Sequence, residues 1–203
     1  MADLITLQQY KDFNGLESVK NDARINAIID NVSQLVKNYC ASSIVDFAST
    51  PKTEFFTIKD DLVDTIILEE SPLITVTSVQ ERESQSDSYV TLITENSDNS
   101  GKYEYVVDLE SDSIIRTTST GTRSFKKGHK SVKVVYRAGY TSTPEDLKLA
   151  VFDLIKYYIK DERKERMSIA GASVESAVST SLRNNIGFPD HIKRVLDMYK
   201  IYS

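Results

Sequence analysis

The stretch 134–167 constrains the fold most, because it contains the signals for a strand, a turn and a helix in succession. The alternation that leads into it places Val132, Val134 and Tyr136 on one face, and a period of two predicts a half-buried strand. An Ala-Gly dipeptide ending at Gly139 then breaks this pattern. We therefore expect a strand that turns sharply and enters a helix.

The start of that helix is specified by its first residues. Thr143 is the expected N-cap, since its hydroxyl can accept a backbone N–H, and Pro144 suits the first helical position because it has no N–H to leave unpaired. Asp146 adds negative charge at the positive end of the helix dipole. A charged segment, 160–166, indicates where the helix leaves the core. The stripe predicted to pack on that core is Leu147, Ala150, Val151, Leu154, Ile155 and Tyr158.

Three further helices are predicted. Residues 6–13 form a short helix capped by Thr6, and residues 18–39 form a longer one. Pro189 starts a closing helix that is expected to run to the last residue. The serine-rich segment 168–188 has no period and is expected to be a functional or mobile loop, disordered before assembly. The expected buried stripe of the second helix is Ile25, Ile28, Val32, Leu35 and Tyr39.

Residues 50–136 have a different character, with short β-rich runs between polar turn signals. Their short connections favour antiparallel pairing, because parallel strands need long crossovers. The predicted fold class is α+β, a helical bundle formed by 1–49 and 137–203 that carries 50–136 as a large antiparallel insertion. The candidate strands are 53–58, 65–69, 75–81, 89–94, 103–108, 114–117 and 131–136.

Composition excludes several classes of protein. The net charge of −5 over 203 residues argues against sequence-independent DNA binding, although a local basic patch remains compatible with it. Cys40 is the single cysteine, so no intrachain disulfide can form. The N-terminal residues do not follow a signal-peptide pattern, and no apolar run reaches the length of a membrane helix. We expect a protein made in the cytoplasm, with no membrane partner.

Residues for catalysis or metal binding are not found in a recognisable arrangement. Neither His129 nor His191 lies at a recognised spacing from another metal-ligand type, and the calcium-loop-like start at 96–101 fails because Val107 occupies the glutamate position. We expect no catalytic residue, metal or cofactor. An acidic cluster is read as solvated surface rather than as a cation site: Asp60, Asp61, Asp64, Glu69 and Glu70.

A basic loop at 122–130 is the other charged feature. It fits a phosphate contact, the tip of a solvated hairpin or a contact with an acidic partner, and the last two readings are favoured together. Its residues, which surround Phe125 and His129, are Arg123, Lys126, Lys127 and Lys130.

The order of these parts resembles the head–tail connector (adaptor or head-completion) proteins of tailed bacteriophages. The resemblance covers nearly the whole chain. Its most specific piece runs from Tyr136-x-Ala138-Gly139-Tyr140 to Pro144-x-Asp146-Leu147. The other pieces are the 6–13 helix, a second helix ending at Asn38-Tyr39-Cys40, the strand entry at 71–79 and the Phe188-Pro189 start of the closing helix.

This resemblance implies a non-enzymatic structural protein of the virion neck. It implies a homododecameric ring beneath the portal protein, joined to a stopper or tail-completion protein, with double-stranded DNA passing through the lumen without sequence-specific binding. Genome packaging and ejection would both use that channel. The alternative is a ligand-binding or protein-binding β module on a helical base, and an enzyme ranks third.

The resemblance also suggests two surfaces. The closing helix is expected to dock on the portal, and its alternative is packing on its own long helix. The charged segment after the long helix is expected to form a subunit–subunit seam, and its alternative is a solvated helix end. The docking residues are Ile192, Val195, Leu196, Tyr199, Ile201 and Tyr202, and the seam residues are Lys160, Glu162, Arg163, Lys164, Glu165 and Arg166.

Overall fold

The computed structural model describes residues 2–93, 104–118, 121–159 and 188–201, together with the backbone of two short strands, β9 (Met167–Ile169) and β10 (Ala172–Val174). The chain divides into two compact units. The helical unit consists of Met1–Ser42 and Ser142–Tyr202, and the β unit is Ser43–Thr141.

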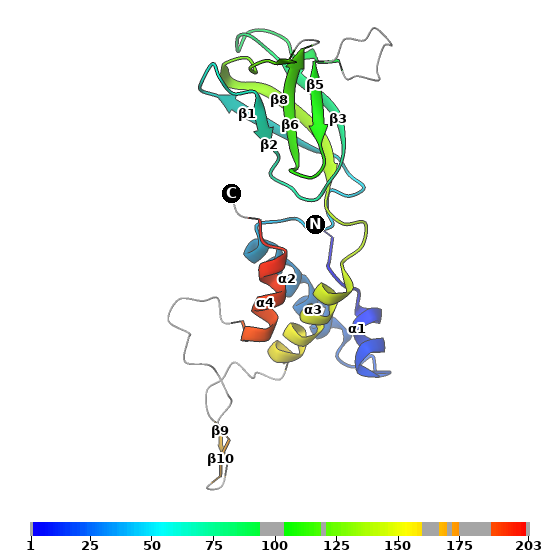
Figure 1. The fold of residues 1–203 in the computed structure, drawn as a ribbon. Helices are drawn as coiled ribbons and strands as arrows, with labels where there is room; N and C mark the ends of the chain where they lie inside the picture. Colours follow the sequence, from blue (N-terminus) through cyan, green and yellow to red (C-terminus); the bar gives the residue numbers. More distant parts are fainter. Residues whose placement is uncertain are drawn as a thin grey trace. The chain divides into compact units, whose positions relative to one another are not determined.

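The helical unit is built around its second helix, which packs against the other three (Figure 1). The first helix starts with a capping box, in which Thr6 and Gln9 each accept a backbone N–H of the other residue, and ends at Gly15 in the left-handed conformation. The capped start at Thr6 confirms the sequence prediction. The helices are α1 (Leu7–Asn14), α2 (Asp22–Cys40), α3 (Glu145–Ile159) and α4 (Asp190–Met198).

The start and the buried face of α2 differ from prediction. The helix begins at Asp22 rather than at residue 18, because the chain first makes a turn at 20–21. Two apolar stripes run side by side on α2, and the pattern alone did not decide between them. Ile28, Leu35 and Tyr39 are half-buried, while the buried stripe follows spacings of four, three, four and four: Ile25, Ile29, Val32, Val36 and Cys40.

The ends of α3 and α4 also need correction. The first of these helices begins at Glu145, and the hydroxyl of the predicted cap, Thr143, donates to the carbonyl of Leu4 at 2.6 Å. The apolar stripe of α3 is buried as predicted, except that Tyr158 is half-buried. Helix α4 ends at Met198 instead of continuing to the last residue. After Met198 the chain is held by a bond from the Ile201 amide to the carbonyl of Cys40.

The β unit contains two sheets in which every strand pair is antiparallel, as the short connections predicted. The four-stranded sheet has the order β1 (Lys52–Ile58), β8 (Gly128–Ala138), β3 (Leu73–Glu81) and β4 (Val90–Thr91). The second sheet has the order β2 (Thr65–Ile67), β6 (Ser113–Thr118) and β5 (Tyr105–Asp108), with β7 (Gly121–Thr122) paired to β6.

Three short strands were missed by the sequence prediction. Strand β7 has two residues, while β9 and β10 have three each and pair with each other. The expectation of an irregular loop is therefore wrong for 168–169 and 172–174. Runs this short contain less than two periods of alternation, so no pattern can develop. The other residues between 170 and 187 lie outside the described part.

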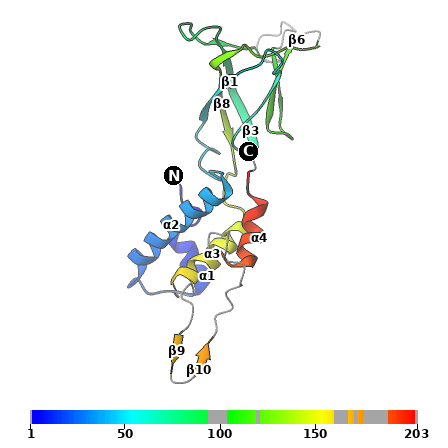
Figure 2. The same ribbon diagram turned by 90° about the vertical axis from the view of Figure 1, so that its left-hand side faces the viewer.

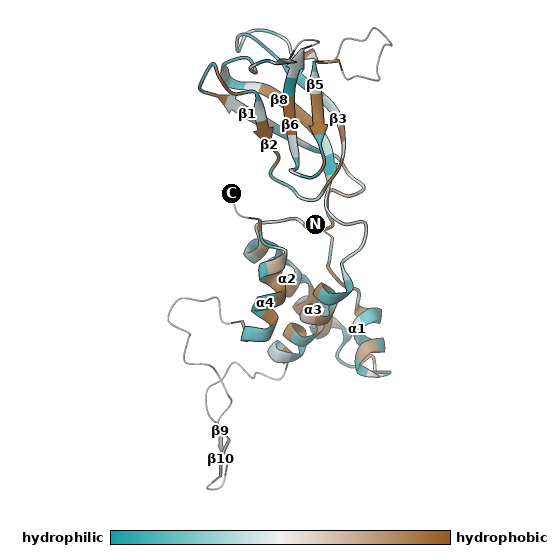
Figure 3. Ribbon diagram, in the orientation of Figure 1, coloured by the Kyte–Doolittle hydropathy of each residue, from teal (hydrophilic) through white to brown (hydrophobic). Residues whose placement is uncertain are grey.

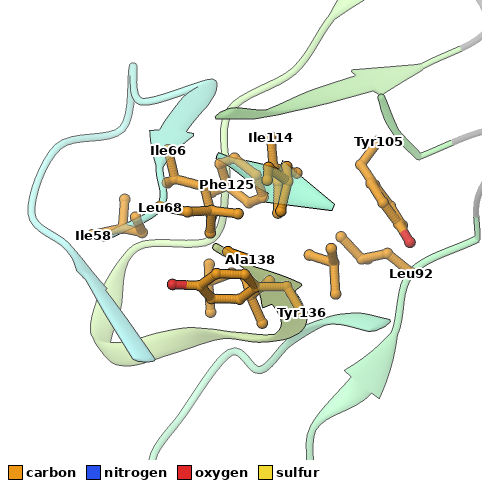
Figure 4. Packing of buried hydrophobic residues seen from close by; sticks show 13 residues of the cluster. Ile58, Ile66, Leu68, Leu92, Tyr105, Ile114, Phe125, Tyr136 and Ala138 are labelled. Carbon is orange, nitrogen blue, oxygen red and sulfur yellow. The ribbon is translucent and has the colours of Figure 1, made fainter. Parts of the chain in front are cut away.

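The two sheets share one hydrophobic core. In Figure 2, β1, β8 and β3 lie side by side, and their inward residues pack against those of the second sheet. Figure 4 shows Tyr136 and Ala138 of β8 across the cluster from Leu68 and Phe125. The buried members of the cluster are Ile58, Ile66, Leu68, Leu73, Val79, Leu92, Tyr105, Ile114, Phe125, Val132, Val134, Tyr136 and Ala138.

A buried ion pair crosses from one sheet to the other. The Arg116 guanidinium on β6 contacts both carboxylate oxygens of Glu81 on β3, at 3.2 and 3.3 Å, and both side chains are 3 % exposed. Arg116 also donates to the carbonyls of Glu104 and Thr117, while Glu81 accepts the amide of Lys126. Because each remaining polar atom has a partner, the pair is tolerated inside an apolar sandwich.

The entry and exit of the β unit are fixed by backbone contacts at Gly139. The Gly139 amide donates to Pro72, and the flanking amides of Ala138 and Tyr140 donate to Phe47 and Ile44. The backbone of Gly139 has φ +95°, and a Cβ built there would lie 2.3 Å from the Ile44 carbonyl oxygen. The position therefore needs glycine for two separate reasons.

We expect Gly139→Ala to lower the free energy of unfolding by about 2–4 kcal/mol, because strain at positive φ adds to the clash with Ile44. Gly15→Ala is the matched control, since Gly15 also has positive φ but has open space around its Cα. That control should lose only about 1–2 kcal/mol. Urea unfolding of both variants measures the difference, and equal losses would contradict the role of the close contact.

Arg116→Met should destabilise the β unit by about 3–5 kcal/mol, because it leaves the Glu81 carboxylate buried without its counter-charge. Replacing both partners, as Arg116→Met with Glu81→Leu, should recover part of that loss, since no buried charge then remains. Urea unfolding of the two single variants and the double variant gives the coupling. Additive losses would show that the pair is not coupled.

Candidate interaction surfaces

The predicted docking stripe of α4 lies against its own unit. Ile192 is 1 % exposed and Leu196 is 0 % exposed, and α4 packs on α2 and α3. These two side chains are therefore unavailable to a partner in this structure. Packing of the closing helix on the long helix of its own chain was the alternative that the sequence left open. Val195 and Ile201 are half-buried, and Tyr202 lies outside the described residues.

Polar contacts hold α4 in the same position. Tyr39 donates to the Asp197 carboxylate, and Tyr199 donates to the Asp146 carboxylate at the start of α3. The Cys40 thiol points at the carbonyl of Leu196, and burial raises its pKa to about 12. Cys40 is therefore a fully buried, structural thiol.

The outward side of α4 presents an apolar residue that the pattern did not select. Met198 is 67 % exposed at the end of the helix. It lies outside the predicted stripe, so a search for helical periodicity passes over it.

The predicted seam lies outside the described residues, because all of its members fall at 160–166: Lys160, Glu162, Arg163, Lys164, Glu165 and Arg166.

The basic loop is not the tip of a hairpin. Phe125 is buried in the sandwich core, so the loop is pinned at its centre. Lys126 pairs with Glu83, and Lys127 pairs with Asp61 at 3.3 Å. Lys130 lies at the start of β8, and Arg123 is exposed beside β7. Two of the four predicted cations are thus already neutralised by the chain's own carboxylates.

Members of the predicted acidic cluster also pair with other groups of the chain itself. Glu70 is buried and accepts bonds from the Ser43 amide, the Ser43 hydroxyl and the Lys52 ammonium, which ties the start of the β unit to β1. Glu69 pairs with Lys52 as well. Among the described residues, no group of three or more histidine, cysteine or acidic side chains is placed to hold a metal ion.

A polar cleft on the helical unit is lined by residues that include Asp3, Asp30, Ser33 and Lys37. Burial, together with the nearby Asp30 carboxylate, raises the pKa of Asp3. The Lys37 ammonium donates to the carbonyl of Ala2, and Ser33 accepts the amide of Leu4. These contacts tie the N-terminal residues onto α2.

An apolar patch on the helical unit was also missed. Phe13 stacks on Phe152 with their ring centroids 4.5 Å apart, yet it remains half exposed. Leu149 is exposed one helical turn before Phe152. Leu16 and Val19, in the segment after α1, are exposed as well. Phe13 and Leu149, which both neighbour Phe152, form an exposed apolar patch of the kind that indicates an interaction surface.

In the described part of the chain, no helix combines the length and the apolar character that crossing a membrane requires. Figure 3 shows hydrophobic residues along the helices of the bundle and along β2 and β5.

Comparison with known proteins identifies the fold. The chain is similar to a protein in the neck of an empty gene transfer agent (GTA) particle computed with C6 symmetry, at 16% identity, a TM-score of 0.57 and coverage of 98% of this chain and 91% of that one. It is also similar to a protein in the neck of the native GTA particle computed with C12 symmetry, at 14% identity, a TM-score of 0.57 and coverage of 100% and 95%.

A further likeness is to a protein in the virion of the native GTA particle, at 14% identity, a TM-score of 0.56 and coverage of 98% and 91%. No curated protein matches the chain. The sequence profile of one family, described as "Head completion protein", matches residues 3–202. Because that match spans both units, the chain belongs to the head completion protein family.

Proposed function

We propose that this protein is a structural component of the particle neck, where it joins the head to the tail. The observation that carries the proposal is the match to the head completion family over residues 3–202, which includes both units. The likeness to neck proteins covers nearly the full length of each chain and adds support. The family is named for a step in particle assembly, which favours a structural role over an enzymatic one.

The finer proposal is a ring of twelve copies beneath the portal, with a stopper or tail-completion protein on the other side and DNA in the lumen. The symmetry of the similar neck structures supports a ring, since C6 and C12 are both compatible with twelve subunits. A ring uses a heterologous interface, in which each subunit presents two different complementary faces. We assign the connector body to the helical unit and regard the β unit as an insertion into it.

Light scattering measures the assembly directly. The full chain, alone or mixed with the portal protein of the same virus, should give a particle whose added mass corresponds to about twelve copies. A ring without portal, or a monomer that joins the portal stoichiometrically, supports the proposal. A monomer that shows no affinity for the portal at any tested concentration would overturn it.

For portal docking we propose the outward side of α4 and the residues that follow, including Val195, Met198 and Ile201. Met198→Glu should weaken portal binding at least about tenfold, because burying an unpaired carboxylate in an interface raises the free energy of the complex. Leu62→Glu is the matched control, since Leu62 is exposed in the β unit. Titration of labelled variants against portal gives the ratio, and equal affinities would remove α4 from the interface.

We further propose that an acidic lumen lets DNA slide rather than stick. With a net charge of −5, assembled rings should retain little linear double-stranded DNA at physiological salt. A filter-retention assay with rings and free subunits measures this. Tight retention by the rings would rule out a non-adhesive channel.

A further inference from the structure

The outward face of the four-stranded sheet carries cations and aromatic rings. Residues directly opposite each other on neighbouring strands point to the same side of a sheet. Phe55 of β1 lies opposite Lys133 of β8, and Arg137 lies opposite Thr75 of β3. The register places the following residues on this side, which we call the basic face: Thr53, Phe55, Thr75, Ser78, Gln80, Thr91, Lys133, Val135 and Arg137.

Cation–π contacts shape the end of the basic face nearest Lys130. The Lys130 ammonium lies 5.7 Å from the centre of the Phe55 ring, and the Lys133 ammonium lies 5.8 Å from that of Tyr89. Arg82 also stacks on Tyr89, but its guanidinium donates to the carbonyls of Gln85, His129 and Lys130 and is therefore structural. Lys130, Lys133 and Arg137 make no ion pair with any described residue.

The outward face of the second sheet has the opposite character. Strands β2, β5 and β6 of this sheet each contain an apolar doublet, so that one member lies in the core and the other points outward. Ile67 is 70 % exposed and Val106 is 40 % exposed. Ser113 lies on this side as well but is buried. The register places the following further residues on this side, which we call the acidic face: Thr65, Ile67, Val106, Asp108 and Ile115.

Carboxylates border this apolar surface at one end. Asp108 ends β5, and its pKa is lowered because its carboxylate accepts the Ser111 hydroxyl and the Glu110 amide. Leu109 and Glu110 follow it in an exposed turn. The basic face thus contains no acidic residue and the acidic face contains no basic one. The two lie on opposite sides of the sandwich, because both sheets bury their inner faces in the shared core.

These properties fit a second copy of the chain better than nucleic acid. Exposed apolar groups such as Ile67 and Phe55 gain nothing from a phosphate backbone, and three unpaired cations release few counterions. An apolar surface with an acidic border does complement an aromatic surface with cations. Complementary faces on opposite sides of one unit are also what a head-to-tail ring requires.

We propose that the acidic face of each β unit packs on the basic face of the next copy around the ring, an inference that rests on the ring proposed above. The β unit then forms a subunit–subunit contact, in addition to any contact made by the helices. Each copy contributes one face to each neighbour, so the contact repeats until the ring closes.

Cysteine cross-linking tests the polarity of this contact. Cys40 is fully buried and has a raised pKa, so it can stay in place while Thr53→Cys and Thr65→Cys mark the two faces. Assembled full-length protein carrying both substitutions, treated with a short bismaleimide, should give a ladder of covalent dimers, trimers and higher multiples. Either single variant should give no such ladder, because a head-to-tail contact brings the two different faces together.

Each outcome separates the contact from the ring itself. Assembled particles that give no ladder would overturn the contact while leaving the ring intact. Strong dimer formation by a single variant would indicate a two-fold contact and would also overturn it. Failure of the chain to assemble, alone and with portal, would overturn both proposals.

A charge placed on the acidic face gives an independent readout. Ile67→Glu should raise the concentration needed for assembly by about tenfold or more, because the carboxylate would be buried against the neighbour. Leu62→Glu is the control, since Leu62 is exposed but lies in the loop before β2, off this face. Thermal melts establish that both variants are folded. Equal assembly by the two folded variants would contradict the proposal.

Discussion

The β unit depends on one strand, β8, which is hydrogen-bonded along both edges. It spans Gly128–Ala138 and pairs with β1 on one side and β3 on the other. Its inward residues Val132, Val134 and Tyr136 are completely buried in the middle of the core. Because the side-chain period is two, a slip of one residue in β8 would turn these side chains to solvent and bring Lys133 inside. Pairing on both edges prevents that slip.

Local signals in the sequence predicted most of the fold. Thr6, Gly15 and the alternation before Gly139 act within a few residues of themselves, so their consequences follow without knowledge of the tertiary structure. The buried stripe of α2 required more information. Ile25 and Val32 belong to both of its apolar stripes, and only the position of the neighbouring helices decides that Ile29 and Val36 are the buried members. The α+β class was therefore predictable, while the face of α2 was not.

The interaction surfaces were harder to predict than the fold, for a physical reason. An apolar stripe is equally suited to a core and to an interface, and Ile192 and Leu196 belong to the core of their own unit. The basic loop was selected by charge alone, yet Lys126 and Lys127 are paired with carboxylates distant in sequence. Conversely, the opposed faces of the sandwich combine residues from seven strands, and no segment of sequence displays them together.

The bonds that close the base of the β unit bear on how such a protein can evolve. Ile44 and Tyr140 are almost one hundred positions apart, yet the Tyr140 amide donates to the Ile44 carbonyl at 2.7 Å. The two ends of the insertion therefore lie as close together as the ends of a tight loop. The length of the insertion adds little to the entropic cost of bringing these ends together. Lineages can lengthen, shorten or replace the insertion while the bundle keeps its packing. Variation in size among relatives is expected to concentrate between these two positions.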